Sequence, residues 1–303
     1  MFTIGTIGSR KYGVAKKADL VAVKVLGSGG SGTMSDVTAG VLWAVEDAKK
    51  ISAKLAANPS TKAAKKHKGF VANMSLGGGK SPTLDIAVNG AVDNGLHFAV
   101  AAGNENNDAC NTSPAGAKNP ITIGASTIGD ERAYFSNWGK CVDVFAPGLN
   151  IKSTWNSGKD AVNTISGTSM ATPHIVGMIA YFLSIYGTQD FAVIKDAIPM
   201  PTFGEDAQVK QGVFASFSRG AHALLNTLPL PSLVMDFVAD NFFLVDASAA
   251  DKKKELDVVS VLHPADMKKA FTKFATRGIL TDIDAASPNL LAFNNATSPS
   301  DMH

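Results

Sequence analysis

The stretch of this sequence that points most directly to chemistry is ISGTSMATPH, residues 165–174. In it, Ser169 follows Gly-Thr and precedes an apolar run that is typical of a buried helix. A hydroxyl nucleophile benefits from that position, because free N–H groups at a helix N-terminus stabilise a developing oxyanion. The string therefore indicates nucleophilic catalysis by Ser169, whereas a bare Gly-Thr-Ser is more often a simple helix N-cap.

A second candidate is Asn104, which stands in VAAGNENN directly after an apolar strand predicted at residues 96–102. An asparagine at the carboxyl end of a strand can aim its side-chain amide at a reaction centre of an α/β sheet. Taken alone, an asparagine here is more often a turn residue.

Two glycine-rich segments also adjoin predicted strands, NMSLGGG at 73–79 and GSGGSGTMS at 27–35. Bare glycines beside a strand allow a second backbone to pair by main-chain hydrogen bonds, as in peptide binding. The spacing of Gly27, Gly29 and Gly32 also satisfies the G-x-G-x-x-G pattern of dinucleotide sites. A lone match of this kind is weak, so nucleotide binding is a minor alternative.

These residues are positioned by alternating strands and helices. Apolar periodicity predicts strands at 20–26, 70–76, 96–102, 121–126 and 141–146, and helices at 34–57, 83–94 and 170–186. Ser35 is the expected cap of the first helix, Gly95 ends the second, and Pro173 is placed in the first turn of the third. Such alternation predicts an α/β fold with a mainly parallel sheet covered by helices.

The pattern weakens after Gly187, where short helices are predicted only near 214–226 and 231–243. An amphipathic helix at 264–276, ended by Gly278, and a strand at 290–293 follow. We therefore divide the chain into a core (1–187), a long insertion of unassigned role (188–258), a C-terminal helix and strand (259–296) and a polar tail (297–303).

Composition adds few constraints. The chain has 303 residues, of which 45% are hydrophobic and 18% charged, with a net charge of +2. This balance favours no nucleic-acid partner, and the lysine groups at 62–68 and 252–254 are read as solvated. No apolar run of membrane-spanning length and no signal peptide are expected, and the two cysteines could be paired or free.

Taken together, ISGTSMATPH, VAAGNENN and CVDVFAPG resemble the subtilases, the family of subtilisin and proteinase K, and in particular its fungal members. The resemblance implies a three-layer α/β/α fold and serine endopeptidase activity. Ser169 would be the nucleophile and Asn104 the oxyanion-hole asparagine. The peptide substrate would be bound by Gly30, Ser31, Gly32, Met34, Ser75, Leu76, Gly77, Ala101, Ala102 and Gly103.

The resemblance also bears on disulfide and metal sites. Cysteines pair at the places of Cys110 and Cys141 in related fungal members, so a disulfide is expected, which in turn implies a secretory-route protein, vacuolar or extracellular. Asp143 resembles an acid that holds a structural calcium ion, and a purely structural carboxylate is the alternative. No cofactor for catalysis is expected.

The family supplies its catalytic Asp and His from D-T/S-G and H-G-T-H motifs, and neither motif occurs in this sequence. GTIGSRKYG, from Gly5, resembles the text that follows the catalytic His, so the expected chain lacks the N-terminal strands and the base. We expect it to be inactive alone; the alternatives are a peptide-binding pseudoenzyme or a gene-model fragment. The expected partners are a peptide or protein substrate and an inhibitory propeptide, with a monomeric state and no membrane.

Overall fold

The computed structural model describes residues 2–186 and 262–292. Its helices are α1 (Phe2–Gly8), α2 (Met34–Ala56), α3 (Lys62–Lys66), α4 (Pro82–Asp93), the short 3₁₀ turn η1 (Ala109–Asn111), α5 (Thr168–Ile185) and α8 (Pro264–Phe274). Its strands are β1 (Val71–Met74), β2 (Gly78–Gly79), β3 (His97–Ala101), β4 (Thr112–Ser113), β5 (Ile121–Ser126), β6 (Val144–Pro147), β7 (Ile151–Thr154), β8 (Val162–Ile165), β9 (Thr276–Arg277) and β10 (Leu290–Leu291). The helices predicted at 214–226 and 231–243 lie outside the described residues.

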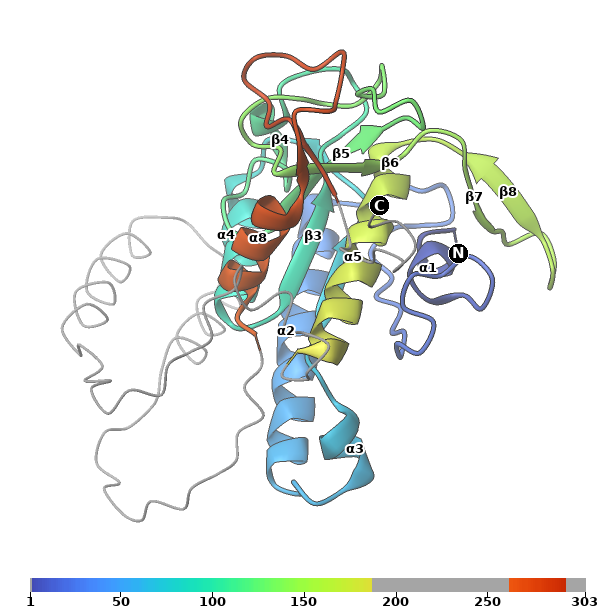
Figure 1. Cartoon of the computed structure of the whole chain (residues 1–303). Helices are drawn as coiled ribbons and strands as arrows, with labels where there is room; N and C mark the ends of the chain where they lie inside the picture. Colours follow the sequence, from blue (N-terminus) through green and yellow to red (C-terminus); the bar gives the residue numbers. More distant parts are fainter. Residues whose placement is uncertain (1, 187–261, 293–303) are drawn as a thin grey trace, which may run out of the picture. The chain divides into compact units, whose positions relative to one another are not determined.

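The central sheet has the strand order β1-β3-β5-β6-β10-β9 (Figure 1). Strands β1, β3, β5 and β6 are parallel, β10 pairs in parallel with β6, and β9 runs antiparallel to β10. The register places Met74 beside Val100 and Ala101 beside Ile123, so β1, β3 and β5 end at one edge of the sheet. The mainly parallel sheet predicted from the sequence is confirmed.

Helices cover both faces of this sheet, which gives the expected three-layer α/β/α arrangement. On one face, α5 and α8 pack against Ala99 of β3 and Ile121 and Ile123 of β5. On the other face, α2 and α4 pack against Phe98 and Val100 of β3. Because side chains alternate across a strand, β3 contributes to both layers of the core.

The sequence predicted no apolar run of membrane-spanning length, but Thr168–Ile185 has sufficient length and hydropathy. Two thirds of this α5 helix, 67%, is buried inside the protein. Phe182 of α5 packs against Phe271 of α8 with ring centroids 5.3 Å apart. The helix is therefore explained as the core element of the fold.

Two local predictions are wrong. Residues 20–26 form no strand, and Val21 is 67% exposed, because no neighbouring strand in the described part of the chain offers its N–H and C=O groups to this run. The run instead lies along α2, where a Cβ on Gly40 would meet Val25 at 2.2 Å. The cap of α2 is Thr33 rather than Ser35, since its hydroxyl accepts from the N–H of Asp36.

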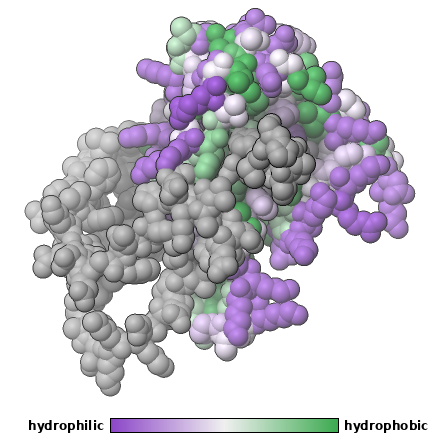
Figure 2. All heavy atoms as spheres, viewed as in Figure 1, coloured by the Kyte–Doolittle hydropathy of each residue, from purple (hydrophilic) through white to green (hydrophobic). Residues whose placement is uncertain are grey.

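Lysines form a solvated surface, as predicted, at the end of the molecule where α3 lies. Lys62, Lys65 and Lys66 are all exposed. Figure 2 shows hydrophilic residues gathered there and over the β7–β8 hairpin. The second lysine group, at 252–254, lies outside the described residues.

Candidate active site

The candidate nucleophile Ser169 is the second residue of α5, which begins at Thr168, two residues before the predicted start at Met170. Gly167 immediately precedes α5 and has a φ of 155°, which glycine adopts readily. The N–H of Ser169 is therefore among the first four of the helix, which have no acceptor within the helix. The Ser169 hydroxyl donates to the carbonyl oxygen of Ser75 at 3.2 Å.

A proline in α5 leaves the Ser169 carbonyl free to bind a residue at the end of β1. Pro173 is the sixth helical residue, not a first-turn residue as predicted, so the Ser169 carbonyl four residues earlier receives no N–H from it. The hydroxyl of Ser75 donates to that carbonyl instead, at 2.9 Å, and Asn73 Nδ2 donates to Ser75 Oγ at 3.0 Å. Ser75 and Ser169 thus hold each other through two reciprocal hydrogen bonds.

The candidate oxyanion residue Asn104 is oriented by the same helix N-terminus. Its Oδ1 accepts from the N–H of Thr168 at 2.7 Å and from the Thr168 hydroxyl at 2.9 Å. The Thr168 hydroxyl in turn accepts from the N–H of Gly103 at 3.2 Å. Because two donors fix Oδ1, Nδ2 is the end of the amide left to donate, and no described residue accepts from it.

Residues 103–107 are shaped by Asn137, which the sequence did not single out. This fully buried side chain accepts from the N–H groups of Glu105 and Asn107 at 3.0 and 2.9 Å. It donates to the Ala102 carbonyl and to Glu105 Oε2, both at 2.9 Å. Its sequence context, Ser-Asn-Trp-Gly, is that of an ordinary turn, so only the fold reveals its role.

The structure brings most of the predicted substrate residues together. Ser75, Leu76 and Gly77 follow β1, and Ala101, Ala102 and Gly103 end or follow β3, which is the neighbouring strand in the sheet. Met34 joins them, because a Cβ on Gly78 would lie 2.6 Å from the Met34 methyl group. Ala101 and Ala102 are buried, and the backbone of Ala102 is already paired, since its N–H donates to the Ile123 carbonyl at 3.0 Å and its carbonyl accepts from Asn137 Nδ2 at 2.9 Å.

The other predicted peptide-binding segment is not placed against the serine. Gly30, Ser31 and Gly32 lie in an exposed turn in which the N–H of Gly27 donates to the Ser31 carbonyl at 2.8 Å. The nucleotide alternative for these glycines loses its basis here, since the fingerprint requires a strand before the glycines and residues 20–26 form none.

None of the four histidines that the structure describes hydrogen-bonds to Ser169. His174 Nδ1 contacts the Met170 carbonyl at 2.9 Å along α5, and burial lowers its pKa. Burial also lowers the pKa of His97 to about 4. His67 lies against Phe70 and His263 caps α8. His222 and His303 lie outside the described residues.

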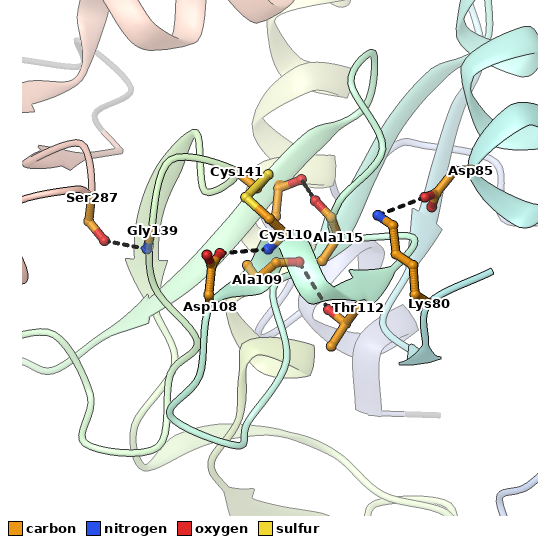
Figure 3. Close-up of a disulfide and its surroundings, with 11 residues drawn as sticks. Lys80, Asp85, Asp108, Ala109, Cys110, Thr112, Ala115, Gly139, Cys141 and Ser287 are labelled. Carbon is orange, nitrogen blue, oxygen red and sulfur yellow. Dashed lines mark hydrogen bonds and ion pairs between the residues drawn. A yellow bond between two sulfur atoms is a disulfide. The ribbon is translucent and has the colours of Figure 1, made fainter. Parts of the chain in front are cut away.

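The expected disulfide between Cys110 and Cys141 is confirmed (Figure 3). It joins the turn after β3 to the segment before β6, across a sequence separation of 31 residues. Asp108 accepts from the Cys110 N–H at 2.8 Å, and the Gly139 N–H donates to Ser287 Oγ at 2.6 Å. The bridge therefore lies in a region with further hydrogen bonds and links the segment that follows the Asn104 loop to the segment before β6.

A serine hydroxyl at the start of a buried helix, beside a carboxamide whose free end is a donor, is an arrangement typical of serine hydrolases on α/β folds. The family follows from sequence. Residues 4–213 match the model of the Subtilase family, and the chain belongs to that family.

Fungal proteases are among its relatives. The chain is 54% identical over 260 residues to Alkaline protease 2 of Aspergillus fumigatus, covering 82% of this chain and 50% of that protein. It is 48% identical over 294 residues to the Subtilisin-like serine protease Pen c 2 of Penicillium citrinum, covering 97% of this chain and 50% of that protein. The chain thus spans about half the length of the curated relatives it matches.

A solved structure agrees with the fold. The crystal structure of a cold-adapted subtilisin-like serine proteinase matches with a TM-score of 0.63 and 32% sequence identity, over 98% of this chain and 74% of that one.

Proposed function

We propose that the protein hydrolyses peptide bonds through an acyl-enzyme on Ser169. The observation that carries the proposal is the orientation of Asn104, whose Oδ1 is fixed by two donors from Thr168 next to the candidate nucleophile. Because Oδ1 is held in this way, Nδ2 is the end of the amide that would donate to an oxyanion formed at Ser169, and this supports the proposal.

In this reaction Ser169 Oγ bonds to the carbonyl carbon of the substrate and its proton passes to a base. The oxyanion accepts from the Ser169 N–H and from Asn104 Nδ2. The C–N bond then breaks, the leaving amine takes the proton, and a water molecule hydrolyses the ester. Each step needs a base, and we assign none among the described residues, because the only hydrogen-bond partner of the Ser169 hydroxyl there is the Ser75 carbonyl.

Within residues 2–186 and 262–292 no base contacts Ser169, which favours a second candidate function for this chain alone, a peptide-binding protein without catalysis. An unassisted serine hydroxyl is a weak nucleophile. The exposed backbone of Gly77 and the neighbouring end of β3 would still offer an extended peptide a surface to bind.

We further propose that the substrate is a peptide or protein and that the protein passes through the secretory route, vacuolar or extracellular, as a monomer made with an inhibitory propeptide. The Cys110–Cys141 disulfide supports that route, because disulfides persist in oxidising compartments.

The test is labelling with a fluorophosphonate probe. The full-length protein should label on Ser169, and Ser169→Ala should abolish the labelling; the present chain should label far more slowly. Asn104→Ala is the matched variant, since it keeps the nucleophile but removes the amide donor, and should lower the labelling rate roughly 10²–10³-fold. Labelling of the full-length protein that survives Ser169→Ala would exclude Ser169 as the nucleophile. Rapid labelling of this chain would reveal a base within it.

A further inference from the structure

An ammonium group is surrounded by oxygen atoms at the amino-terminal ends of β5 and β6. Nζ of Lys268, on α8, lies 2.9 Å from the Lys118 carbonyl oxygen, 2.7 Å from the Pro120 carbonyl oxygen and 2.8 Å from Asp143 Oδ2. The lysine and aspartate side chains are 23% and 18% exposed. The three donors of the ammonium group are therefore matched by three acceptors, two carbonyls from one loop and one carboxylate, all far from Lys268 in sequence.

The oxygen atoms around Nζ are also held in place by hydrogen bonds that do not involve Lys268. The N–H of Asn119 donates to Asn89 Oδ1, and Asn119 Nδ2 donates to Asp93 Oδ1, both at 2.8 Å, so α4 holds the loop between the two carbonyls. Asp143 is held from the other side, because its Oδ2 accepts from the Thr122 N–H at 2.8 Å. Two carbonyls and a carboxylate converging on one point are the ligands typical of a cation site.

The calcium ion implied for Asp143 does not fit beside this lysine. Calcium takes about six to eight oxygens at roughly 2.3–2.6 Å, whereas the oxygens here surround Nζ at hydrogen-bonding distances of 2.7–2.9 Å. A divalent ion and an ammonium group cannot share the point, since both are positive and the same oxygens would serve both.

We propose that Lys268 supplies from within the chain the cation that this oxygen pocket requires, so that this part of the fold is stable without a metal ion. The ammonium group takes the place of a bound cation: it neutralises Asp143, donates to two backbone carbonyls and links α8 to the ends of β5 and β6. Helix α8 also contacts the helix of the candidate active site, because Phe271 of α8 packs on Phe182 of α5, which carries Ser169.

The experiment follows the thermal midpoint of the full-length protein with and without calcium. Lys268→Ala should lower the midpoint by about 5–10 °C, because the largely buried Asp143 carboxylate loses its cation and two carbonyls lose the ammonium donor. Calcium at millimolar concentration should restore much of that loss by entering the vacated pocket, and adding Asp143→Asn should abolish the restoration. Lys268→Met, which keeps the apolar stem, serves if the alanine variant does not fold.

Lys269→Ala is the matched control, because Lys269 is the next residue of α8, is largely exposed and pairs only with Asp266 among the described residues. It should change neither the midpoint nor the calcium response. Three results would overturn the proposal: a loss in Lys268→Ala no larger than in the control, a loss that calcium does not restore, or calcium stabilisation of the unaltered protein that Asp143→Asn removes.

Discussion

Replacing Thr168 with valine tests how the candidate oxyanion hole is held. The side chain is fully buried, and its hydroxyl makes two bonds: it accepts from the Gly103 N–H at 3.2 Å and donates to Asn104 Oδ1 at 2.9 Å. Valine has nearly the same shape and lacks the hydroxyl, so packing stays close to that of the original and both bonds are lost. The backbone N–H of Thr168 still holds Oδ1 at 2.7 Å.

The magnitude follows from these contacts. A buried N–H left without an acceptor costs about 1–3 kcal/mol, and a lost hydrogen bond between neutral groups about 1 kcal/mol. Since the Thr168 N–H remains as a donor to Oδ1, we expect only part of this lost stabilisation, about 1–2 kcal/mol, to raise the free energy of the transition state. That corresponds to a kcat lower by roughly 5–30-fold. KM should stay nearly constant, because the oxyanion exists only after attack.

The assay is steady-state hydrolysis of a chromogenic peptide by the full-length protein, with the thermal midpoint measured in parallel. Thr168→Ser keeps the hydroxyl and should retain most of kcat, while Asn104→Ala should lose roughly 10²–10³-fold. A valine variant with unchanged kcat would refute the reasoning, as would a serine variant that loses as much as valine or a change confined to KM.

Three further predictions concern stability and specificity. Substituting both Cys110 and Cys141 with serine should cost about 3–4 kcal/mol, because the bridge closes a loop of 31 residues; urea midpoints measure this, and a wild-type midpoint insensitive to reductant would contradict it. Burial lowers the pKa of His97 to about 4, so below pH ~6.5 the unfolded chain takes up a proton that the folded chain does not, and stability should fall by roughly 3 kcal/mol as the pH drops from ~6.5 to ~4. His97→Gln should flatten this slope in urea unfolding at pH 7 and 4.5, and equal slopes in both proteins would show that other groups cause it. If the proposed hydrolysis holds, the full-length protein should prefer an apolar or aromatic residue before the scissile bond, because the nearby Glu105 carboxylate already accepts from Asn104 N–H and Asn137 Nδ2; a peptide-library profile dominated by Lys or Arg would overturn this.

The elements with strong local signals were predicted closely. Strand β5 has the predicted bounds of 121–126, and α4 ends at Asp93 before Gly95, which has the positive φ of 89° typical of a glycine after a helix. The run at 20–26 was misread because its composition favours a strand, whereas strand formation also needs a neighbour with free backbone groups. Composition contains no information about that neighbour.

Apart from the Cys110–Cys141 disulfide, which the family resemblance implied, the side-chain contacts between distant residues could not be predicted. Asn137 organises residues more than 30 positions earlier, and Lys268 binds a carbonyl 150 positions earlier. Nothing in the local sequence marks either residue, since an asparagine in a turn and a lysine on an amphipathic helix are ordinary in those places. The candidate site around Ser169 and Asn104 was predicted from the resemblance of the whole motifs to the subtilases, since a bare Gly-Thr-Ser is more often a helix N-cap and an asparagine here is more often a turn residue.

The position of Pro173 in α5 was also predicted wrongly, because a contact with a distant residue offsets its cost. A proline inside a helix removes a hydrogen bond and costs about 3 kcal/mol, so sequence reasoning moves it into the first turn, where the cost is small. The structure instead places it in the helix proper and offsets the loss with the hydroxyl of Ser75, which donates to the carbonyl that the proline leaves free. That carbonyl belongs to Ser169. The local irregularity of α5 therefore leaves the carbonyl of the candidate nucleophile without a helical N–H donor, and Ser75 at the end of β1 donates to it instead.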